Sequence, residues 1–273
     1  EKSIMNPHAK SLKNSLYPSA ITLLVLATLG MSTAAIAQSE SNASNKNESN
    51  FTVGAGLAYS PEYEGSEDYK TSVLPLINYR NGRFFAGALG GIGYDLSTKK
   101  GLSIGPVLSY QPGRDESDHE RLKGLGDIDP SANLGAFVKW DLQPFSVNST
   151  IKQGLGGDVS GTELKLGVGY ALPLGPKDSL NFDASINWAD QDIMEGYFGV
   201  TPEQSNSSGL ATYDASAGIR RYGVGASWTH IYTPKVFSTL NAGVYQLGSE
   251  AADSPITTSR TGGLVGASVG YKF

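Results

Sequence analysis

Apolar and polar side chains alternate with a period of two along most of the chain from Phe51 to Phe273. Residues 133–142 are typical: leucine, alanine, valine and tryptophan occupy the even positions, while asparagine, glycine, phenylalanine, lysine and aspartate occupy the odd ones. Residues 164–172 and 180–188 repeat the pattern. Successive side chains of a strand point to opposite faces, so each segment has one apolar face and one small or polar face.

The alternation predicts about twelve strands near ten residues long, the length of membrane-spanning strands, whereas strands of soluble proteins average about five or six. A soluble β-sandwich also alternates, but here the second face carries glycine, serine, asparagine and single charges, which suits a barrel lumen. We therefore predict an all-β fold, a transmembrane antiparallel β-barrel over residues 51–273. The expected strands cover 51–60, 71–80, 83–96, 101–111, 132–143, 145–155, 162–173, 179–189, 211–220, 221–232, 235–247 and 261–273.

Charges are expected on the lumen side of these strands, where they either line a narrow channel or form salt bridges across a closed interior. Pro75 and Pro106 interrupt two strands, and because proline removes a ladder donor each predicts a bulge or a local break. The lumen-side charges are Lys139, Asp141, Lys152, Lys165, Asp183, Asp214, Arg220 and Lys272.

The last segment ends the chain on an aromatic residue. In "GGLVGASVGYKF", Val269, Tyr271 and Phe273 share one face with the other apolar residues. This ending resembles the C-terminal signal by which the barrel-assembly machinery recognises bacterial outer-membrane barrels. Together with the alternation, it predicts insertion among the lipids of an outer membrane.

The first residues predict export. From Met5, the expected true start, Lys10 and Lys13 precede a short apolar run at 20–31, and a small-x-small site ends at Ala35 and Ala37. This is the pattern of a cleaved signal peptide over residues 1–37. The polar residues 38–50 lack the apolar side chains that offset ordering entropy, so we expect a disordered tail.

Composition narrows the possible functions. The chain has no cysteine, so neither disulfides nor thiolate chemistry are available to it. Its net charge of −5 argues against nucleic-acid binding. We expect no cofactor and no metal.

One segment stands out by its charge: "RDESDHERLKGLGDID" at 114–129. Its spacing fits neither a calcium loop nor a zinc set. Ser117 with Glu120 predicts a capping box and a single helical turn closed by Gly124. We expect either a solvated loop or a loop that binds a partner or plugs the lumen, carried by Arg114, Asp115, Glu116, Asp118, His119, Glu120, Arg121, Asp127 and Asp129.

The sequence offers few side chains suited to acid–base or nucleophilic catalysis. Beyond the signal peptide the chain has only His119 and His230. Lipid-hydrolysing barrels use a serine activated by a histidine at the lipid face, but Ser227 faces away from His230. We expect His230 to belong to an interfacial aromatic belt, and we predict that the protein is not an enzyme.

Several segments together resemble the MipA/OmpV family of outer-membrane proteins: "GLAYSPEYEGSEDYKTSVLPLINY" (56–79), "GPVLSYQPGRDESDHERLKGLGDID" (105–129), "EGYFGVTPEQS" (195–205) and "AADSPI" (251–256). The resemblance implies an outer-membrane barrel of a Gram-negative bacterium. It also implies a scaffold for periplasmic murein enzymes, because one member binds a lytic transglycosylase and is thought to link it to a penicillin-binding synthase. A small-solute pore and a surface adhesin or immunogenic protein are the alternatives.

The expected strand order conflicts with the usual placement of loops on the two sides of the outer membrane. Barrels of this class place both termini and the short turns in the periplasm and the longer loops outside. Counting the expected strands puts 61–70 and 248–260 outside but 112–131 and 190–210 in the periplasm. Either one strand is miscounted, or the barrel has elaborate periplasmic loops that would suit a scaffold.

Overall fold

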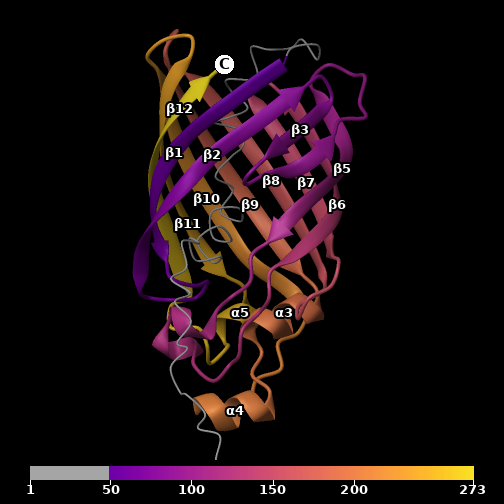
Figure 1. Cartoon of the computed structure of the whole chain (residues 1–273), viewed down its shortest axis with the longest axis vertical. Helices are drawn as coiled ribbons and strands as arrows, with labels where there is room; N and C mark the ends of the chain where they lie inside the picture. The colour runs from indigo at the N-terminus through magenta and orange to yellow at the C-terminus, as the bar shows by residue number, and fades with distance from the viewer. Residues whose placement is uncertain (1–48) are drawn as a thin grey trace, which may run out of the picture.

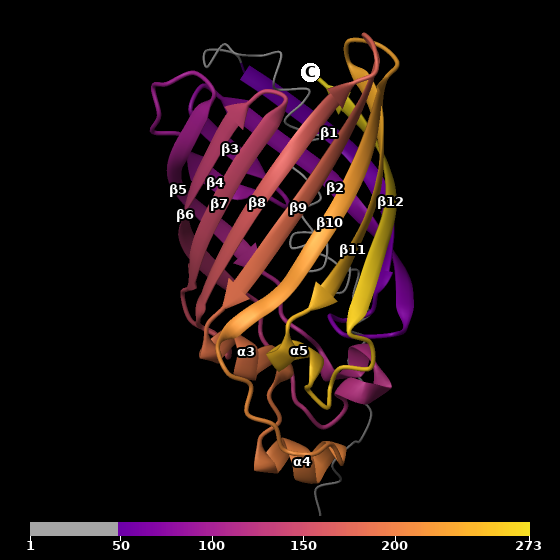
Figure 2. The same cartoon turned by 180° about the vertical axis from the view of Figure 1, so that it is seen from behind.

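A closed antiparallel β-barrel of twelve strands forms the body of the protein, as predicted (Figures 1 and 2). The computed structural model describes residues 49–273. The expected signal peptide, with Ala35 and Ala37, and the expected tail as far as residue 48 lie outside the described residues. The strands are β1 (Ser49–Pro61), β2 (Tyr69–Asn81), β3 (Phe84–Gly87), β4 (Gly91–Tyr94), β5 (Leu102–Gln111), β6 (Ser131–Leu142), β7 (Phe145–Gly154), β8 (Thr162–Pro173), β9 (Asp178–Ala189), β10 (Gly218–Ile231), β11 (Val236–Leu247) and β12 (Thr261–Lys272).

The two faces of the wall differ as the alternation predicts. On β8, Leu166, Val168 and Tyr170 are exposed, whereas the intervening Lys165 and Gly167 are not. A continuous apolar outer surface is stable only in lipid, where a closed barrel also pairs every backbone group. None of the helices among the described residues is long and apolar enough to cross a membrane.

The predicted total of twelve strands is correct only because two errors in the predicted strands cancel. The expected strand at 83–96 is a hairpin of two four-residue strands, β3 and β4, reversed at Gly91, whose φ of 79° suits glycine. The separate strand expected at 211–220 is absent: residues 211–217 belong to a connection and 218–220 begin β10. Asp214, expected in the lumen, therefore lies in this connection and is exposed.

The corrected count moves every connection longer than seven residues to one end of the barrel. Residues 62–68, 112–130, 155–161, 190–217 and 248–260 all join strands there, which we name the loop end. The short links and the C-terminus lie at the opposite, terminal end, as Figure 1 shows. The prediction that 112–131 and 190–210 lie on the same side of the membrane as the termini was wrong. Its cause was the miscounted strand.

Both prolines that interrupt strands border the short hairpin. Pro75 pairs with Ala55 of β1, but β3 pairs with β2 only from Asn78 onward. Pro106 pairs with Ala136 of β6, and β4 reaches β5 only at Val107 and Leu108. A residue without an N–H donor is tolerated where the neighbouring ladder is missing, so the predicted local break is confirmed.

The C-terminal residues help to close the barrel. The backbone N–H of Phe273 donates to the Phe51 carbonyl at 2.9 Å, and the two rings stack with centroids 5.6 Å apart. Val269, Tyr271 and Phe273 all lie on the exposed outer face. Their role as an assembly signal stays a prediction.

Candidate functional site

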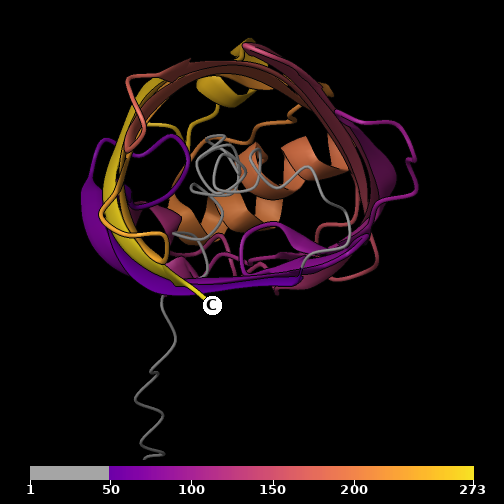
Figure 3. The ribbon, with the colours of Figure 1, turned by 90° about the horizontal axis from the view of Figure 1, so that it is seen from above.

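The five connections of the loop end fold together into a layer that we call the cap. It contains the 3₁₀ turns η1 (Glu116–Asp118) and η2 (Glu120–Leu122) and the helices α3 (Gln191–Phe198), α4 (Pro202–Ser208) and α5 (Ser249–Ala252). Viewed along the barrel in Figure 3, helices lie across the ring of strands. The loop end is thus covered by structure of its own.

A hydrophobic core holds the cap together and joins it to the barrel. Leu122, Ile193, Met194, Phe198 and Ile256 are each at most 1 % exposed and come from three different connections. Burying a side chain of this size contributes about 1.5–3 kcal/mol. The cap is therefore a packed unit rather than a set of solvated loops.

The charged segment at 114–129 is part of this core. It buries Leu122, Leu125 and Ile128 and keeps most of its charges outside. The predicted helical turn is replaced by η1 and η2, and their caps are Asp115 and His119 rather than Ser117, so the predicted capping box is wrong. The chain turns at Gly124 with φ 81°, where glycine was expected.

The segment's polar side chains make internal and inter-loop contacts. His119 Nε2 lies 3.0 Å from Asp68 Oδ2, which ties the segment to the 62–68 connection. Arg121 Nε donates to the Pro255 carbonyl at 3.1 Å in a third connection. Glu116 Oε2 accepts backbone N–H groups of Gly124 at 2.8 Å and of Gly126 at 3.0 Å. The charged side chains of the segment thus join it to neighbouring connections and fix its own backbone.

Three further predicted residues of the segment, Arg114, Asp115 and Asp127, form hydrogen bonds within the cap. Arg114 is buried, and its Nη1 donates to the Tyr197 carbonyl at 3.0 Å. Asp115 accepts the Ser117 N–H at 2.8 Å, and this hydrogen bonding lowers the pKa of the Asp115 carboxyl. Asp127 Oδ1 accepts the Glu116 N–H at 2.8 Å. Within residues 49–273 no group of three or more His, Cys, Asp or Glu side chains is arranged to hold a metal.

Glu120 and Asp129 are exposed members of the segment, whereas Asp118 is partly buried. Glu120 is exposed and pairs with Lys123 at 2.5 Å, which lowers the pKa of the Glu120 carboxyl. Asp129 is exposed, and its backbone N–H donates to Asp158 Oδ2 at 2.8 Å. The structure thus brings the predicted residues together in the cap, with Arg114 buried and most of the others partly or fully exposed.

Two consecutive arginines sit beneath the cap, and a β-bulge puts them there. The register between β9 and β10 shifts between Ile219 and Arg221. The extra residue re-aims its neighbour, so Arg220 and Arg221 both face the interior instead of opposite sides, and each is 1 % exposed. Strict alternation along the strand predicts only Arg220 on the lumen side.

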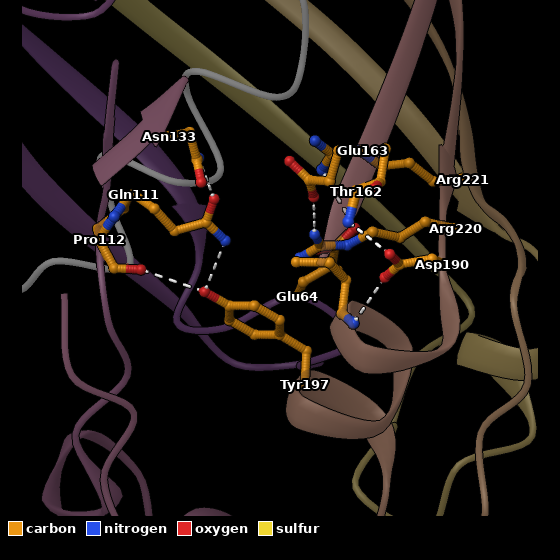
Figure 4. A network of polar contacts seen from close by, with 11 residues as sticks. Glu64, Gln111, Pro112, Asn133, Thr162, Glu163, Asp190, Tyr197, Arg220 and Arg221 are labelled. Carbon is orange, nitrogen blue, oxygen red and sulfur yellow. Dashed lines mark hydrogen bonds and ion pairs between the residues drawn. The ribbon is translucent and has the colours of Figure 1, made fainter. Parts of the chain in front are cut away.

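Both arginines form ion pairs with Glu64, and Arg220 also forms one with Glu163 (Figure 4). Glu64 Oε2 accepts from Arg220 Nε at 2.9 Å, and Glu64 Oε1 lies 3.3 Å from Arg221 Nη1. Arg220 Nη1 also reaches Glu163 Oε1 of β8 at 2.5 Å. Burial by itself raises the pKa of the Glu64 carboxyl, but the two guanidinium groups outweigh it and hold that pKa below its usual range. Glu64 is therefore a carboxylate that locks the 62–68 connection onto the wall.

Tyr197 of α3 links the cap to the opposite side of the wall (Figure 4). Its hydroxyl accepts from Gln111 Nε2 at 3.1 Å and donates to the Pro112 carbonyl at 3.2 Å. Gln111 Oε1 in turn accepts from Asn133 Nδ2 at 2.6 Å, and the Arg220 guanidinium lies 4.8 Å from the Tyr197 ring centre. Burial raises the pKa of the Tyr197 hydroxyl, which stays protonated and able to donate.

His230 lies where the sequence predicted, on the outer face near the terminal end. Its Nδ1 is 2.8 Å from Asp178 Oδ1, and its ring contacts Tyr232 at a centroid distance of 4.6 Å and Trp228 at 6.0 Å. The aromatic-belt interpretation accounts for these neighbours without a catalytic role.

The two ends of the barrel differ in charge. The cap connections contain 18 acidic and four basic residues, a difference of −14. The links of the terminal end contain one acidic and five basic residues, a difference of +4. Those six residues are Asp95, Arg83, Lys99, Lys100, Lys177 and Lys235.

Known proteins resemble between 76% and 93% of the chain. The MltA-interacting protein of Escherichia coli (strain K12) is 27% identical over 261 residues, which cover 93% of this chain and 99% of that protein. The outer membrane protein OmpV of Vibrio cholerae is 24% identical over 211 residues, 76% of this chain and 81% of that one. A solved outer membrane channel from Pseudomonas putida F1 has a TM-score of 0.42 and 13% identity, and covers 83% of this chain and 96% of that one.

The family assignment rests on a family model as well as on single relatives. The model described as MltA-interacting protein MipA matches residues 53–273, which is the whole barrel except the first residues of β1. The closed barrel and the relatives named as outer-membrane proteins agree with this match. The chain is an outer-membrane β-barrel that belongs to the MipA family.

Proposed function

We propose that this barrel anchors a murein enzyme of the lytic-transglycosylase class to the outer membrane and that the enzyme binds at the terminal end. The E. coli relative is named for its interaction with MltA, and it matches this chain over nearly its full length. Outer-membrane barrels place their termini and short links in the periplasm, where murein enzymes work. A penicillin-binding synthase held by the same scaffold is the further partner that the family resemblance implies.

The observation that carries the proposal is the charge of the terminal end. Five basic residues against one acidic residue there favour a partner with an acidic surface. Lys99 and Lys100 are both exposed, in the longest link of this end at 95–101. The charged segment at 114–129 lies at the other end, so it is not the docking site in this proposal.

Capture of a purified lytic transglycosylase by the detergent-solubilised barrel tests the proposal. Lys99→Glu with Lys100→Glu reverses the charge of the 95–101 link, and we expect at least a tenfold loss of captured enzyme at physiological salt. The matched control reverses one cap charge, Lys123→Glu, and should capture as much as the wild type. Equal capture by the double variant and the wild type, or loss with the control alone, would contradict terminal-end docking.

The two other functions considered from the sequence have tests that do not depend on this capture. The cap covers the loop end with a buried core, so we expect planar bilayers containing the protein to stay silent. An adhesin would use the outward surface, where α4 has no buried residue. Protease treatment of whole cells should then cut 202–208 before any other segment.

A further inference from the structure

Unpartnered hydrogen-bond donors gather on one part of the interior wall. Among the described residues, Arg221 Nε, Nη1 and Nη2 and Asn187 Nδ2 are buried and make no hydrogen bond. The 3.3 Å approach of Arg221 Nη1 to Glu64 Oε1 is an ion pair without hydrogen-bond geometry. We infer that Arg221, Asn187 and Lys165 form a binding site for a small oxyanion, a carboxylate or a phosphate, inside the barrel. This site is independent of the partner proposed for the terminal end.

Strand register brings the three side chains together. Lys165 of β8 pairs with Asn187 of β9, and Asn187 pairs with Arg221 of β10. Directly opposed residues of neighbouring strands have Cβ atoms about 4.5–5.5 Å apart. All three have the inward parity, so an ammonium, a carboxamide and a guanidinium stand side by side. In the next inward row Gly167 and Gly223 flank Ser185; the Asn148 side chain lies over Gly167, whereas over Gly223 the nearest side-chain atom is Ser185 Oγ.

The charges of this region leave one positive group without a counterpart. Arg220 is fully engaged by Glu64 and Glu163, and Glu64 also serves Arg221. Lys165 is within electrostatic range of Arg221, Lys152 and Asp183. The charged groups that interact electrostatically with Lys165, Arg220 or Arg221, counted with these three, are four cations and three acids, and a bound monoanion would balance the excess. They are Lys152, Lys165, Arg220 and Arg221 against Glu64, Glu163 and Asp183.

The chemistry of the free donors selects an oxyanion over other ligands. A guanidinium presents a planar fork that matches two oxygens of a carboxylate or phosphate. The carboxamide and the ammonium add donors beside it, and neither Arg221 nor Lys165 can accept a hydrogen bond. The Arg221 guanidinium is held over the Tyr245 ring at 5.5 Å, so its fork is oriented before any ligand arrives. Buried donors without partners are rare in proteins and call for an explanation.

Isothermal titration of the folded, detergent-solubilised protein tests the site. Sodium acetate and sodium phosphate are the two probes, with sodium chloride at the same ionic strength as the reference. We expect saturable binding of at least one oxyanion and none of chloride. Binding of acetate alone identifies a carboxylate ligand, and binding of phosphate alone identifies a phosphate ligand.

Variants then locate the site. Lys165→Gln should weaken binding at least tenfold, and Arg221→Lys, which keeps the charge but loses the fork, should weaken it as well. Lys139→Gln removes another interior lysine, one that lies 3.3 Å from Asp141 on β6, and should bind like the wild type. Each variant is first checked for the folded, heat-modifiable barrel. Absence of saturable binding by the wild type, or unchanged binding by folded Lys165→Gln, overturns the inference.

Discussion

The loop end and the terminal end are built on the same strands but hold together by different means. The loop end has a buried apolar core, two buried arginines and Tyr197 bonds that join five connections. The terminal end has short links and stacked outer aromatics such as Phe51 and Phe273. Packing outside the membrane is therefore confined to the loop end, whereas the terminal end is a rim of short, basic links. We interpret the first as a seal and the second as a docking face.

The comparison predicts that the cap fails when its buried charge network is broken. Arg220→Ala leaves the buried Glu64 and the partly exposed Glu163 without their main partner, and removing one member of a buried pair costs about 3–5 kcal/mol. We expect the free energy of unfolding in urea to fall by that amount. Arg260→Ala removes the exposed pair with Asp253 and should cost at most about 1 kcal/mol. Equal losses for the two variants would mean that the network is not what holds the cap.

A second change attacks the apolar core of the cap alone. Leu122 is fully buried, and Leu→Ala in such a site costs about 2–5 kcal/mol. Leu122→Ala should speed amide hydrogen exchange throughout the cap while the strands near the terminal end stay protected. The exposed neighbour change Lys123→Ala is the control. Exchange that rises equally at both ends would show that the cap is not a separate cooperative unit.

Acid should loosen the loop end before the terminal end. The folded-state pKa of Glu64 is held below its unfolded value near 4.5, so its stabilisation is complete above that value. It is lost as the pH falls through the folded pKa. Proteolysis of the cap should therefore increase below about pH 4.5, and Glu64→Gln should remove this part of the pH dependence. A cap equally resistant at pH 3 and pH 7 would argue against the role of Glu64.

The smallest expected effect concerns one hydroxyl. Tyr197→Phe removes the bonds to Gln111 and to the Pro112 carbonyl and leaves the ring beside Arg220. A net loss of about 1 kcal/mol in unfolding free energy is expected, because a neutral hydrogen bond is worth about that much. Tyr213→Phe, which loses a single bond to the Glu250 carbonyl, is the matched comparison. A Tyr197→Phe variant as stable as the wild type would remove this link from the account.

Much of the barrel could be predicted from alternation, because the lipid face must be apolar in every strand. The failures have local causes. The β3–β4 hairpin reads as one strand since Gly91 keeps the period of two while reversing the chain. Residues 211–217 also alternate, but they lie in a connection.

The cap network was missed for a related reason. Strict alternation puts Arg220 and Arg221 on opposite faces, and only a bulge puts both inside. Two adjacent arginines in a membrane strand were the available signal, because an arginine on the lipid side costs about 2–4 kcal/mol at mid-depth. The partner Glu64 is far away in sequence, and no local pattern points to it.

Cysteine labelling in whole cells tests the division between the ends most directly. The chain has no native cysteine, so single substitutions give a clean signal. Ser117→Cys on the cap and Thr98→Cys in the terminal-end link are both at exposed positions. We predict that a membrane-impermeant maleimide labels Ser117→Cys in intact cells and Thr98→Cys only after the outer membrane is permeabilised. Labelling of Thr98→Cys in intact cells with Ser117→Cys protected would contradict the account.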